Sequence, residues 1–159
     1  KHNQVHLYSV VEEVNVVHKM KECNAVIGGE GNGGVIYPES HYGRDSIVGI
    51  GLFLSLFVER GLTASKLLST YPEYHMVKEK INLSPSLNVD SILSQIAERY
   101  NNENLDLVDG VRIDFTESWV QLRKSNTEPI IRIYSEAKTV DKAKDLIKEI
   151  ETLVNQLTN

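Results

Sequence analysis

Seven consecutive residues in the second half of the chain carry side chains suited to binding an anion. The segment Arg123-Lys-Ser125-Asn126-Thr127-Glu-Pro129 offers a guanidinium, an ammonium, two hydroxyls and an amide, and Arg132 follows it. A phosphate dianion is bound by such a set, because arginine binds it bidentately, hydroxyls donate hydrogen bonds, and successive N–H groups of a turn form a nest. The alternative is a polar turn whose Ser, Asn and Thr side chains satisfy their own backbone. The segment 123–129 is not a Walker A loop, because it contains no Gly-Lys-Ser/Thr sequence.

A second candidate loop is rich in glycine. Residues 28–34, Gly-Gly-Glu-Gly-Asn-Gly-Gly, hold five glycines in seven positions, which permits positive φ and close approach of a ligand. The spacing does not match G-x-G-x-x-G, and the carboxylate of Glu30 would repel a pyrophosphate. Glu30 and the amide of Asn32 are better suited to neutral hydroxyl groups such as those of a sugar. The alternative is a glycine-rich hairpin in which Glu30 is only solvated.

Other kinds of site find little support in the sequence. The five histidines and the single cysteine, Cys23, show no metal-ligand spacing, and Asp106, Asp109 and Asp114 straddle a predicted hairpin. No Ser/His/Asp arrangement stands out. We therefore expect no metal ligand and no catalytic residue in this segment.

Short elements are predicted around the glycine loop. The patterns favour a strand at 5–8, a helix from about Val14 to Cys23, a buried strand at 25–27 and extended structure at 35–37. Asp45 is placed to cap a long apolar helix that Gly61 ends, and we expect the core of the first half on this helix. Thr63 is expected to begin a further short helix before Pro72.

The second half is predicted as strand, helix, three strands, helix. The strands are expected at 75–83, 111–115, 119–122 and 130–135, and the helices near 89–100 and from Thr139 or Asp141 onward. An Asn-rich loop precedes the Asp109-Gly110 turn. This order predicts an α+β domain with helices on one face of a mainly antiparallel sheet.

Length and composition limit the remaining possibilities. The chain has 159 residues, a net charge of −5 and no apolar run near the roughly 20 residues of a membrane-spanning helix. The acidic balance argues against a general nucleic-acid-binding surface. A single cysteine and the lack of a signal sequence favour a cytoplasmic location. We place a domain boundary so that residues 1–73 and 74–159 form two domains. Because the first half lacks an initiator Met and a complete core, we expect it to be the remnant of an α/β domain and Lys1 to be a cut end.

The two loops together resemble those of the α-D-phosphohexomutases, the superfamily of phosphoglucomutase, phosphomannomutase and phosphoglucosamine mutase. The motifs are Gly28-Gly-Glu-Gly-Asn-Gly-Gly34 and Arg123-Lys-Ser-Asn-Thr-Glu-Pro-Ile-Ile-Arg132. Supporting motifs are residues 14–22, Tyr42-Gly-Arg-Asp45 and Asp109-Gly-Val-Arg112 with Trp119. The resemblance covers nearly the whole chain and implies most of a third, sugar-binding domain followed by a C-terminal, phosphate-binding domain.

The resemblance also implies an activity and roles for residues. Members interconvert hexose or hexosamine 1-phosphate and 6-phosphate through a phosphoserine and a bisphosphorylated intermediate. The family pattern implies that Glu30 and Asn32, with Glu13 as a weaker candidate, contact sugar hydroxyls. It implies that the phosphate is held by Arg123, Ser125, Asn126 and Thr127, and Arg132 in the following strand is expected to add positive charge to the same site. The serine loop and the Mg²⁺ loop belong to domains not matched here, so this segment is expected to need its own N-terminal domains and to be inactive alone.

Three departures and two alternatives accompany this interpretation. Glu12 stands where glycine is expected, Lys124 where proline is commoner and Ser46 where glycine often follows. The sequence of the glycine loop, Glu-Gly-Asn-Gly-Gly, resembles that of phosphoglucosamine mutases more than that of phosphomannomutases or phosphoglucomutases, and both alternatives stay open. A more remote alternative is a non-catalytic module that binds protein or nucleic acid through its sheet.

Overall fold

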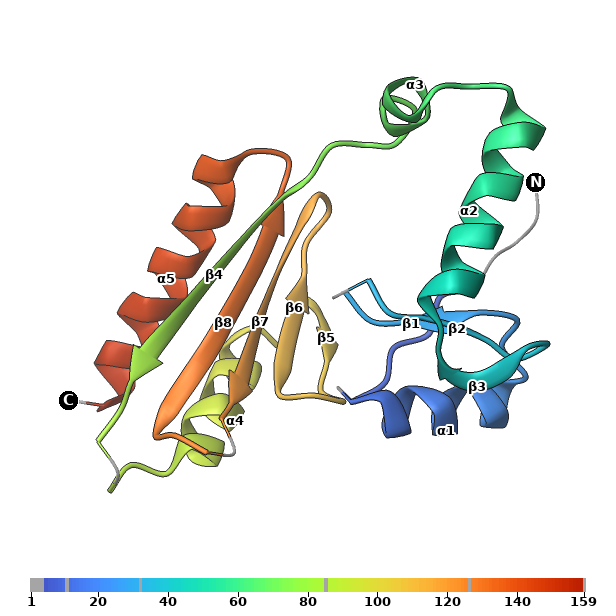
Figure 1. Ribbon diagram of the computed structural model, residues 1–159. Coiled ribbons are helices and arrows are strands. Elements are labelled where there is room, and N and C mark those ends of the chain that lie inside the picture. The colour runs from blue at the N-terminus through green and yellow to red at the C-terminus, as the bar shows by residue number, and fades with distance from the viewer. Residues whose placement is uncertain (1–4, 11, 32, 85, 126, 159) are drawn as a thin grey trace. The chain divides into compact units, whose positions relative to one another are not determined.

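The computed structural model describes residues 5–10, 12–31, 33–84, 86–125 and 127–158. The chain divides into two compact units, Lys1–Pro72 and Glu73–Asn159 (Figure 1).

In its described residues, the first unit combines three helices with a small antiparallel sheet. Its helices are α1 (Glu13–Cys23), α2 (Ser46–Arg60) and α3 (Ala64–Leu68). Its strands are β1 (Gly28–Gly29), β2 (Val35–Tyr37) and β3 (His41–Arg44), in the order β1-β2-β3. The predicted boundaries of α2 are confirmed. Asp45 accepts hydrogen bonds from the N–H groups of Ile47 and Val48, and Gly61 ends the helix with a left-handed φ of 60°.

Three expectations for the first unit are wrong. Residues 5–8 form no strand, and Val26 and Ile27 are exposed at 79% and 53%. Helix α2 contains no buried residue, although it is strongly apolar. The large apolar side chains that it exposes are Ile47, Ile50, Phe53, Leu54 and Val58. The buried apolar residues described in this unit are instead Met20, Ile36 and Leu67. Apolar composition predicted the helix correctly, but composition does not specify what covers a helix.

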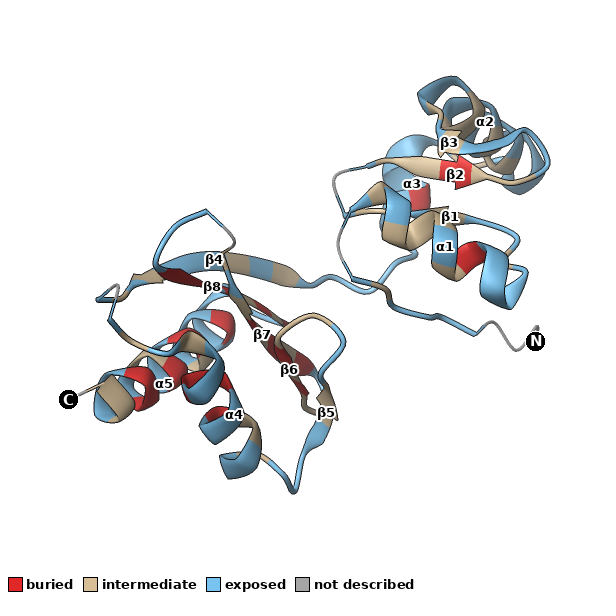
Figure 2. Cartoon of the chain, turned by 90° about the horizontal axis from the view of Figure 1, so that it is seen from below, coloured by how far each residue is buried: buried red, intermediate tan, exposed pale blue. Residues whose placement is uncertain are grey.

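The second unit is an α+β domain, as predicted. Its strands are β4 (His75–Asn82), β5 (Asn104–Asp106), β6 (Val111–Asp114), β7 (Ser118–Lys124) and β8 (Ile130–Ala137). They form one antiparallel sheet in the order β4-β8-β7-β6-β5. The helices α4 (Val89–Arg99) and α5 (Val140–Thr158) lie on one face of it (Figure 2). The segment at 104–106 was expected to be a loop, and it is the short edge strand β5.

Alternation along the strands separates an apolar face from a polar face. The core between sheet and helices includes Ile96, Ile113, Val120, Leu122, Ile131, Ile133, Ile147, Ile150 and Val154. The residues between them on the strands point to the other side, which we call the open sheet face. It carries Arg112, Trp119, Gln121, Arg123, Arg132 and Tyr134, which are partly or fully exposed. Burial of the apolar face thus fixes where Arg123 and Arg132 point.

Candidate functional site

The glycine loop of the first unit is a closed turn between β1 and β2. Glu30 N–H donates to the carbonyl of Gly34 at 3.1 Å, and Gly33 N–H donates to the carbonyl of Glu30 at 3.0 Å. Gly33 has a φ of 91°, a conformation that favours glycine. The turn fixes the backbone at Glu30. Asn32, the second predicted sugar contact in this loop, lies outside the described residues.

Arg44 joins two of the predicted sugar-binding carboxylates. Its backbone N–H and its Nε donate to the two carboxylate oxygens of Glu13, at 3.1 and 2.8 Å. Its Nη1 donates to Oε2 of Glu30 at 3.4 Å. The side chain of Glu30 is only 16% exposed, so this carboxylate is not simply solvated. The structure therefore brings Glu13 and Glu30 together around one guanidinium.

The cluster keeps Glu13 ionised. The backbone N–H of Arg44 is the main cause, and its guanidinium adds to the effect, so the pKa of Glu13 lies below the usual 4.5. One arginine facing two carboxylates leaves oxygen lone pairs that can accept hydrogen bonds from neutral hydroxyl groups. Such acceptors suit a polyol better than an anion.

Arg44 was not among the predicted site residues. Arg44 is the last residue of β3, and the next residue, Asp45, caps the N-terminus of α2. Arg44 therefore lies directly between a strand and a helix cap. A signal for it was present, because Arg44 stands in the Tyr42-Gly-Arg-Asp45 motif. No role could be predicted for Arg44, because its carboxylate partners lie 31 and 14 residues away along the chain.

In the second unit, the hairpin between β7 and β8 carries two neighbouring hydroxyls. Ser125 Oγ and Thr127 Oγ1 are 3.5 Å apart, and Thr127 is exposed. Ser125 N–H donates to the carbonyl of Ile130 at 3.1 Å, and Thr127 N–H donates to Ser125 Oγ at 3.4 Å. The Ser125 amide therefore closes the hairpin and is not available to a ligand, whereas the hydroxyls lie at its accessible end. Asn126 lies outside the described residues.

Two arginines stand directly opposite each other at the base of this hairpin. Arg123 on β7 pairs in register with Arg132 on β8, and both point to the open sheet face. Like charges in this position destabilise a sheet, and each arginine has an acidic neighbour. Arg132 Nη2 is 3.8 Å from Glu128 Oε2, an exposed and loose pair.

The Asp109-Gly110 turn positions Arg123 more tightly. Arg123 Nε is 3.0 Å from Asp109 Oδ2, and solvent reaches neither atom. The N–H does not point at the oxygen, so this is an ion pair without a hydrogen bond. Gly110 has a φ of 80°, and a Cβ there would collide with the carbonyl of Leu122. Glycine at this position thus allows the turn to lie against β7 beside Arg123.

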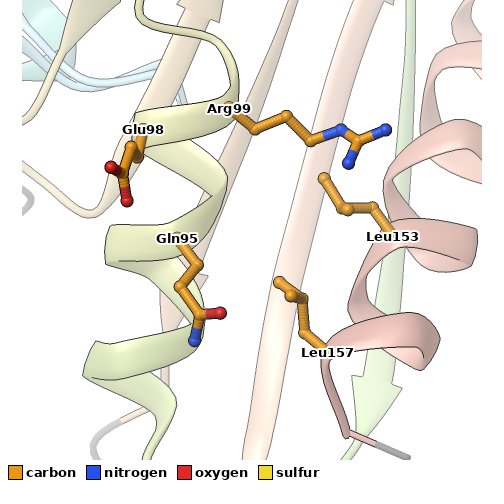
Figure 3. A pocket seen from close by; sticks show the side chains of 5 residues that line it. All are labelled: Gln95, Glu98, Arg99, Leu153 and Leu157. Atoms are coloured by element: carbon orange, nitrogen blue, oxygen red, sulfur yellow. The ribbon is translucent and has the colours of Figure 1, made fainter.

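A shallow hollow of the second unit lies between its helices α4 and α5. Figure 3 shows side chains from α4 and α5 around it, and the lining residues are Gln95, Glu98, Arg99, Leu153 and Leu157. None of the predicted site residues lines it, and the hollow belongs to the helical face of the unit. It plays no part in the proposed function below.

Two family models together match most of the chain. The model described as phosphoglucomutase/phosphomannomutase, alpha/beta/alpha domain III, matches residues 2–74, and the model described as the phosphoglucomutase/phosphomannomutase C-terminal domain matches residues 79–153. The chain belongs to the phosphohexomutase superfamily. Both motifs used for the resemblance lie in the matched ranges, one in each.

Curated relatives agree with this membership. A phosphoglucosamine/phosphogalactosamine mutase of Sulfurisphaera tokodaii is 37% identical over 149 residues, which is 92% of this chain and 33% of that protein. A phosphoglucomutase/phosphomannomutase of Thermococcus kodakarensis is 36% identical over 140 residues, 87% of this chain and 30% of that protein. The chain spans about a third of the length of the phosphohexomutases that it matches.

A solved structure supports the fold. A phosphoglucomutase/phosphomannomutase family protein from Burkholderia thailandensis superimposes with a TM-score of 0.72 at 22% identity. The match covers 96% of this chain and 33% of that one.

Within the described ranges, no group of three or more His, Cys, Asp or Glu side chains is arranged to hold a metal ion. No helix described is long and apolar enough to cross a membrane.

Proposed function

We propose that this chain supplies the sugar-hydroxyl and phosphate contacts of a phosphohexomutase that interconverts the 1-phosphate and the 6-phosphate of a hexosamine. The observation that carries the proposal is the β7–β8 hairpin, where Arg123 and Arg132 are direct cross-strand partners on one face of the sheet and the turn beyond them carries the hydroxyls of Ser125 and Thr127. Two arginines on neighbouring strands, with hydroxyl donors in the connecting turn, suit a dianionic phosphate ester.

In this proposal the hairpin binds the phosphate that is not reacting. Arg123, Arg132, Ser125 and Thr127 hold it, together with Asn126. The Asp109 carboxylate, 3.0 Å from Arg123 Nε, keeps that side chain in place while other N–H groups of the guanidinium donate to the ligand. Binding energy from this remote phosphate orients the reacting end of the sugar.

The carboxylate cluster of the first unit binds the sugar. Glu30 and Glu13, both held by Arg44, accept hydrogen bonds from hydroxyls, and Asn32 is proposed as a further contact. Neutral hydroxyl groups are bound by hydrogen bonds and not by charge, so similar contacts can serve the 1-phosphate and the 6-phosphate in their two orientations.

No residue of this chain is proposed as the nucleophile. In the proposed reaction a phosphoserine elsewhere in the full enzyme transfers its phosphoryl group to the sugar, and the bisphosphorylated intermediate turns before returning the other one. The residues described here bind and orient the sugar phosphate. No step is assigned to Mg²⁺. A cytoplasmic location is also proposed, supported by the single, unpaired Cys23.

Phosphomannomutase or phosphoglucomutase activity is the second candidate. It is supported by the 36% identity to the Thermococcus kodakarensis relative, close to the 37% of the Sulfurisphaera tokodaii relative. The two candidates differ at the sugar 2-position, where an amine replaces a hydroxyl.

The test is a titration of the ¹⁵N-labelled chain followed by NMR. We expect glucosamine 6-phosphate to shift amide resonances in both the Glu30 turn and the 125–129 hairpin, and inorganic phosphate to shift only those of the hairpin. A stronger response to mannose 6-phosphate or glucose 6-phosphate would favour the second candidate. Salt-sensitive binding of an oligonucleotide with no response to sugar phosphate would contradict both. Turnover of a sugar 1-phosphate by this chain alone, with a bisphosphate activator, would contradict the absence of a nucleophile.

A further inference from the structure

Three positive side chains form one row across three adjacent strands of the second unit. Lys80 on β4 is the direct partner of Arg132 on β8, and Arg132 is the direct partner of Arg123 on β7. Direct cross-strand partners have Cβ atoms about 5 Å apart on the same face of a sheet. The row therefore crosses the open sheet face at the base of the 125–129 hairpin.

The row is unfavourable for folding by itself. Like charges directly opposite each other destabilise a sheet, and this row contains two such pairs in succession. Asp109 accompanies Arg123, and Glu128 accompanies Arg132. Lys80 is exposed and makes no ion pair with any residue in the described part of the chain. Clustered positive charges, one of them uncompensated, create a local positive potential that attracts an anion.

The strand that carries Lys80 is fixed to the hairpin. Leu83 N–H donates to the carbonyl of Pro129 at 2.9 Å, and Asn82 pairs in register with Ile130. The backbone at Lys80 is therefore held at a fixed distance from the hydroxyls of Ser125 and Thr127. The ammonium group needs no particular orientation to attract a phosphate, because it acts as a point charge on a flexible stem.

We propose that Lys80 is a third cation of the phosphate site, which binds the phosphoryl group of a sugar phosphate together with Arg132 and Arg123. The inference rests on the proposed function, since it extends the same site by one strand. Lys80 adds positive charge at the edge of the site, so its contribution to the affinity for phosphate decreases as salt is added.

Lys78 provides a matched control on the same strand. It points to the same face two residues away, but its partner in register is Tyr134, and its Nζ lies 5.7 Å from the centre of that ring. Lys78→Gln and Lys80→Gln therefore remove the same charge from the same strand, one outside the row and one within it.

The experiment measures the dissociation constants of inorganic phosphate and glucosamine 6-phosphate for the whole chain at low and high salt. We expect Lys80→Gln to weaken both at low salt by about three- to fivefold, the upper part of the range for one exposed charge pair, and Lys78→Gln to change them by less than about twofold. Lys80→Arg should restore binding. The stability of Lys80→Gln to denaturant should be unchanged or higher, because the substitution removes repulsion from the row.

The outcomes separate this inference from the proposed function. If Arg123→Gln abolishes phosphate binding while Lys80→Gln leaves it unchanged, Lys80 is not part of the site and the proposed function stands. Equal losses in Lys78→Gln and Lys80→Gln would also overturn the inference, because they would indicate a general charge effect. If the unsubstituted chain binds neither ligand, the proposed function fails and this inference fails with it.

Discussion

Arg123 and Asp109 hold their charged atoms 3.0 Å apart, Nε to Oδ2, where solvent reaches neither atom. The two residues come from different parts of the second unit, one from β7 and one from the turn before β6. Gly110 makes this approach possible, because any Cβ at that position would meet the carbonyl of Leu122. The pair therefore links the turn to an arginine of the proposed phosphate site.

Replacing Asp109 by Asn should destabilise the second unit. The change keeps the shape of the side chain but leaves the shielded Arg123 Nε without a negative partner, which we expect to lower the free energy of unfolding by about 1 to 2 kcal/mol. Urea denaturation measures the effect. The control is Asp145→Asn on α5, where the carboxylate is 74% exposed and 3.9 Å from Lys148 Nζ. A loss no larger than in this control would show that the Arg123–Asp109 pair does not stabilise the unit.

Replacing Arg44 by Gln should raise the pKa of Glu13. In the unsubstituted chain Arg44 holds that pKa below 4.5, so the stabilisation from this carboxylate is present above pH 4.5 and is lost as the pH falls through the lowered value. Arg44→Gln removes the guanidinium and should raise the pH at which Glu13 is protonated. The pKa should not return fully to its usual value, because the backbone N–H of residue 44 still donates to the carboxylate. An NMR titration of the Glu13 carboxyl group measures it. Lys19→Gln removes a cation from α1 that pairs with Glu22, and should leave the pKa of Glu13 unmoved.

Replacing Glu12 by Gly should stabilise the first unit. Glu12 precedes α1 with a φ of 98°, a region in which a side chain is strained. Glycine relieves the strain but costs backbone entropy, and we expect a net gain of about 1 kcal/mol in the free energy of unfolding. Asn24→Gly is the comparison, since Asn24 has a φ of 52°, which asparagine adopts readily. A gain at Asn24 equal to that at Glu12 would argue against strain at Glu12.

Replacing Glu128 by Gln should tighten phosphate binding. Glu128 Oε2 lies 3.8 Å from Arg132 Nη2 and repels an incoming anion while it partly neutralises the arginine. Its removal should lower the dissociation constant for inorganic phosphate by about two- to fivefold at low salt. Calorimetric titration measures it. Glu117→Gln changes the same charge in the β6–β7 turn at the opposite end of β7, and it should have little effect. Weaker binding in Glu128→Gln would mean that the carboxylate supports the site by positioning Arg132.

Elements with strong local signals could be predicted from the sequence. Asp45 and Gly61 mark the ends of α2 because a side-chain cap and a left-handed glycine act within a few residues of the chain. Alternating apolar residues predicted β6, β7 and β8 for the same reason. β5 was missed, because Asn-Leu-Asp has little strand preference and becomes a strand by pairing with β6. The prediction that α2 carries the core of the first unit was wrong, because the burial of a helix depends on which other elements pack against it.

The candidate site also has features that depend on local sequence and features that depend on tertiary contacts. Residue types in the two loops suggested a phosphate-binding hairpin and a sugar-binding turn beside plain structural alternatives, and both sites stay predictions, whereas the motifs correctly indicated the superfamily. Only the tertiary structure decided that Arg44 joins Glu13 to Glu30, and that Lys80 stands in register with Arg132 and Arg123. Side-chain chemistry and turn conformation are properties of a few neighbouring residues, whereas these contacts join distant segments. The Arg44 contacts depend on the packing of α1 beside β3, and the Lys80 row depends on strand register, which burial of the opposite face of the sheet determines.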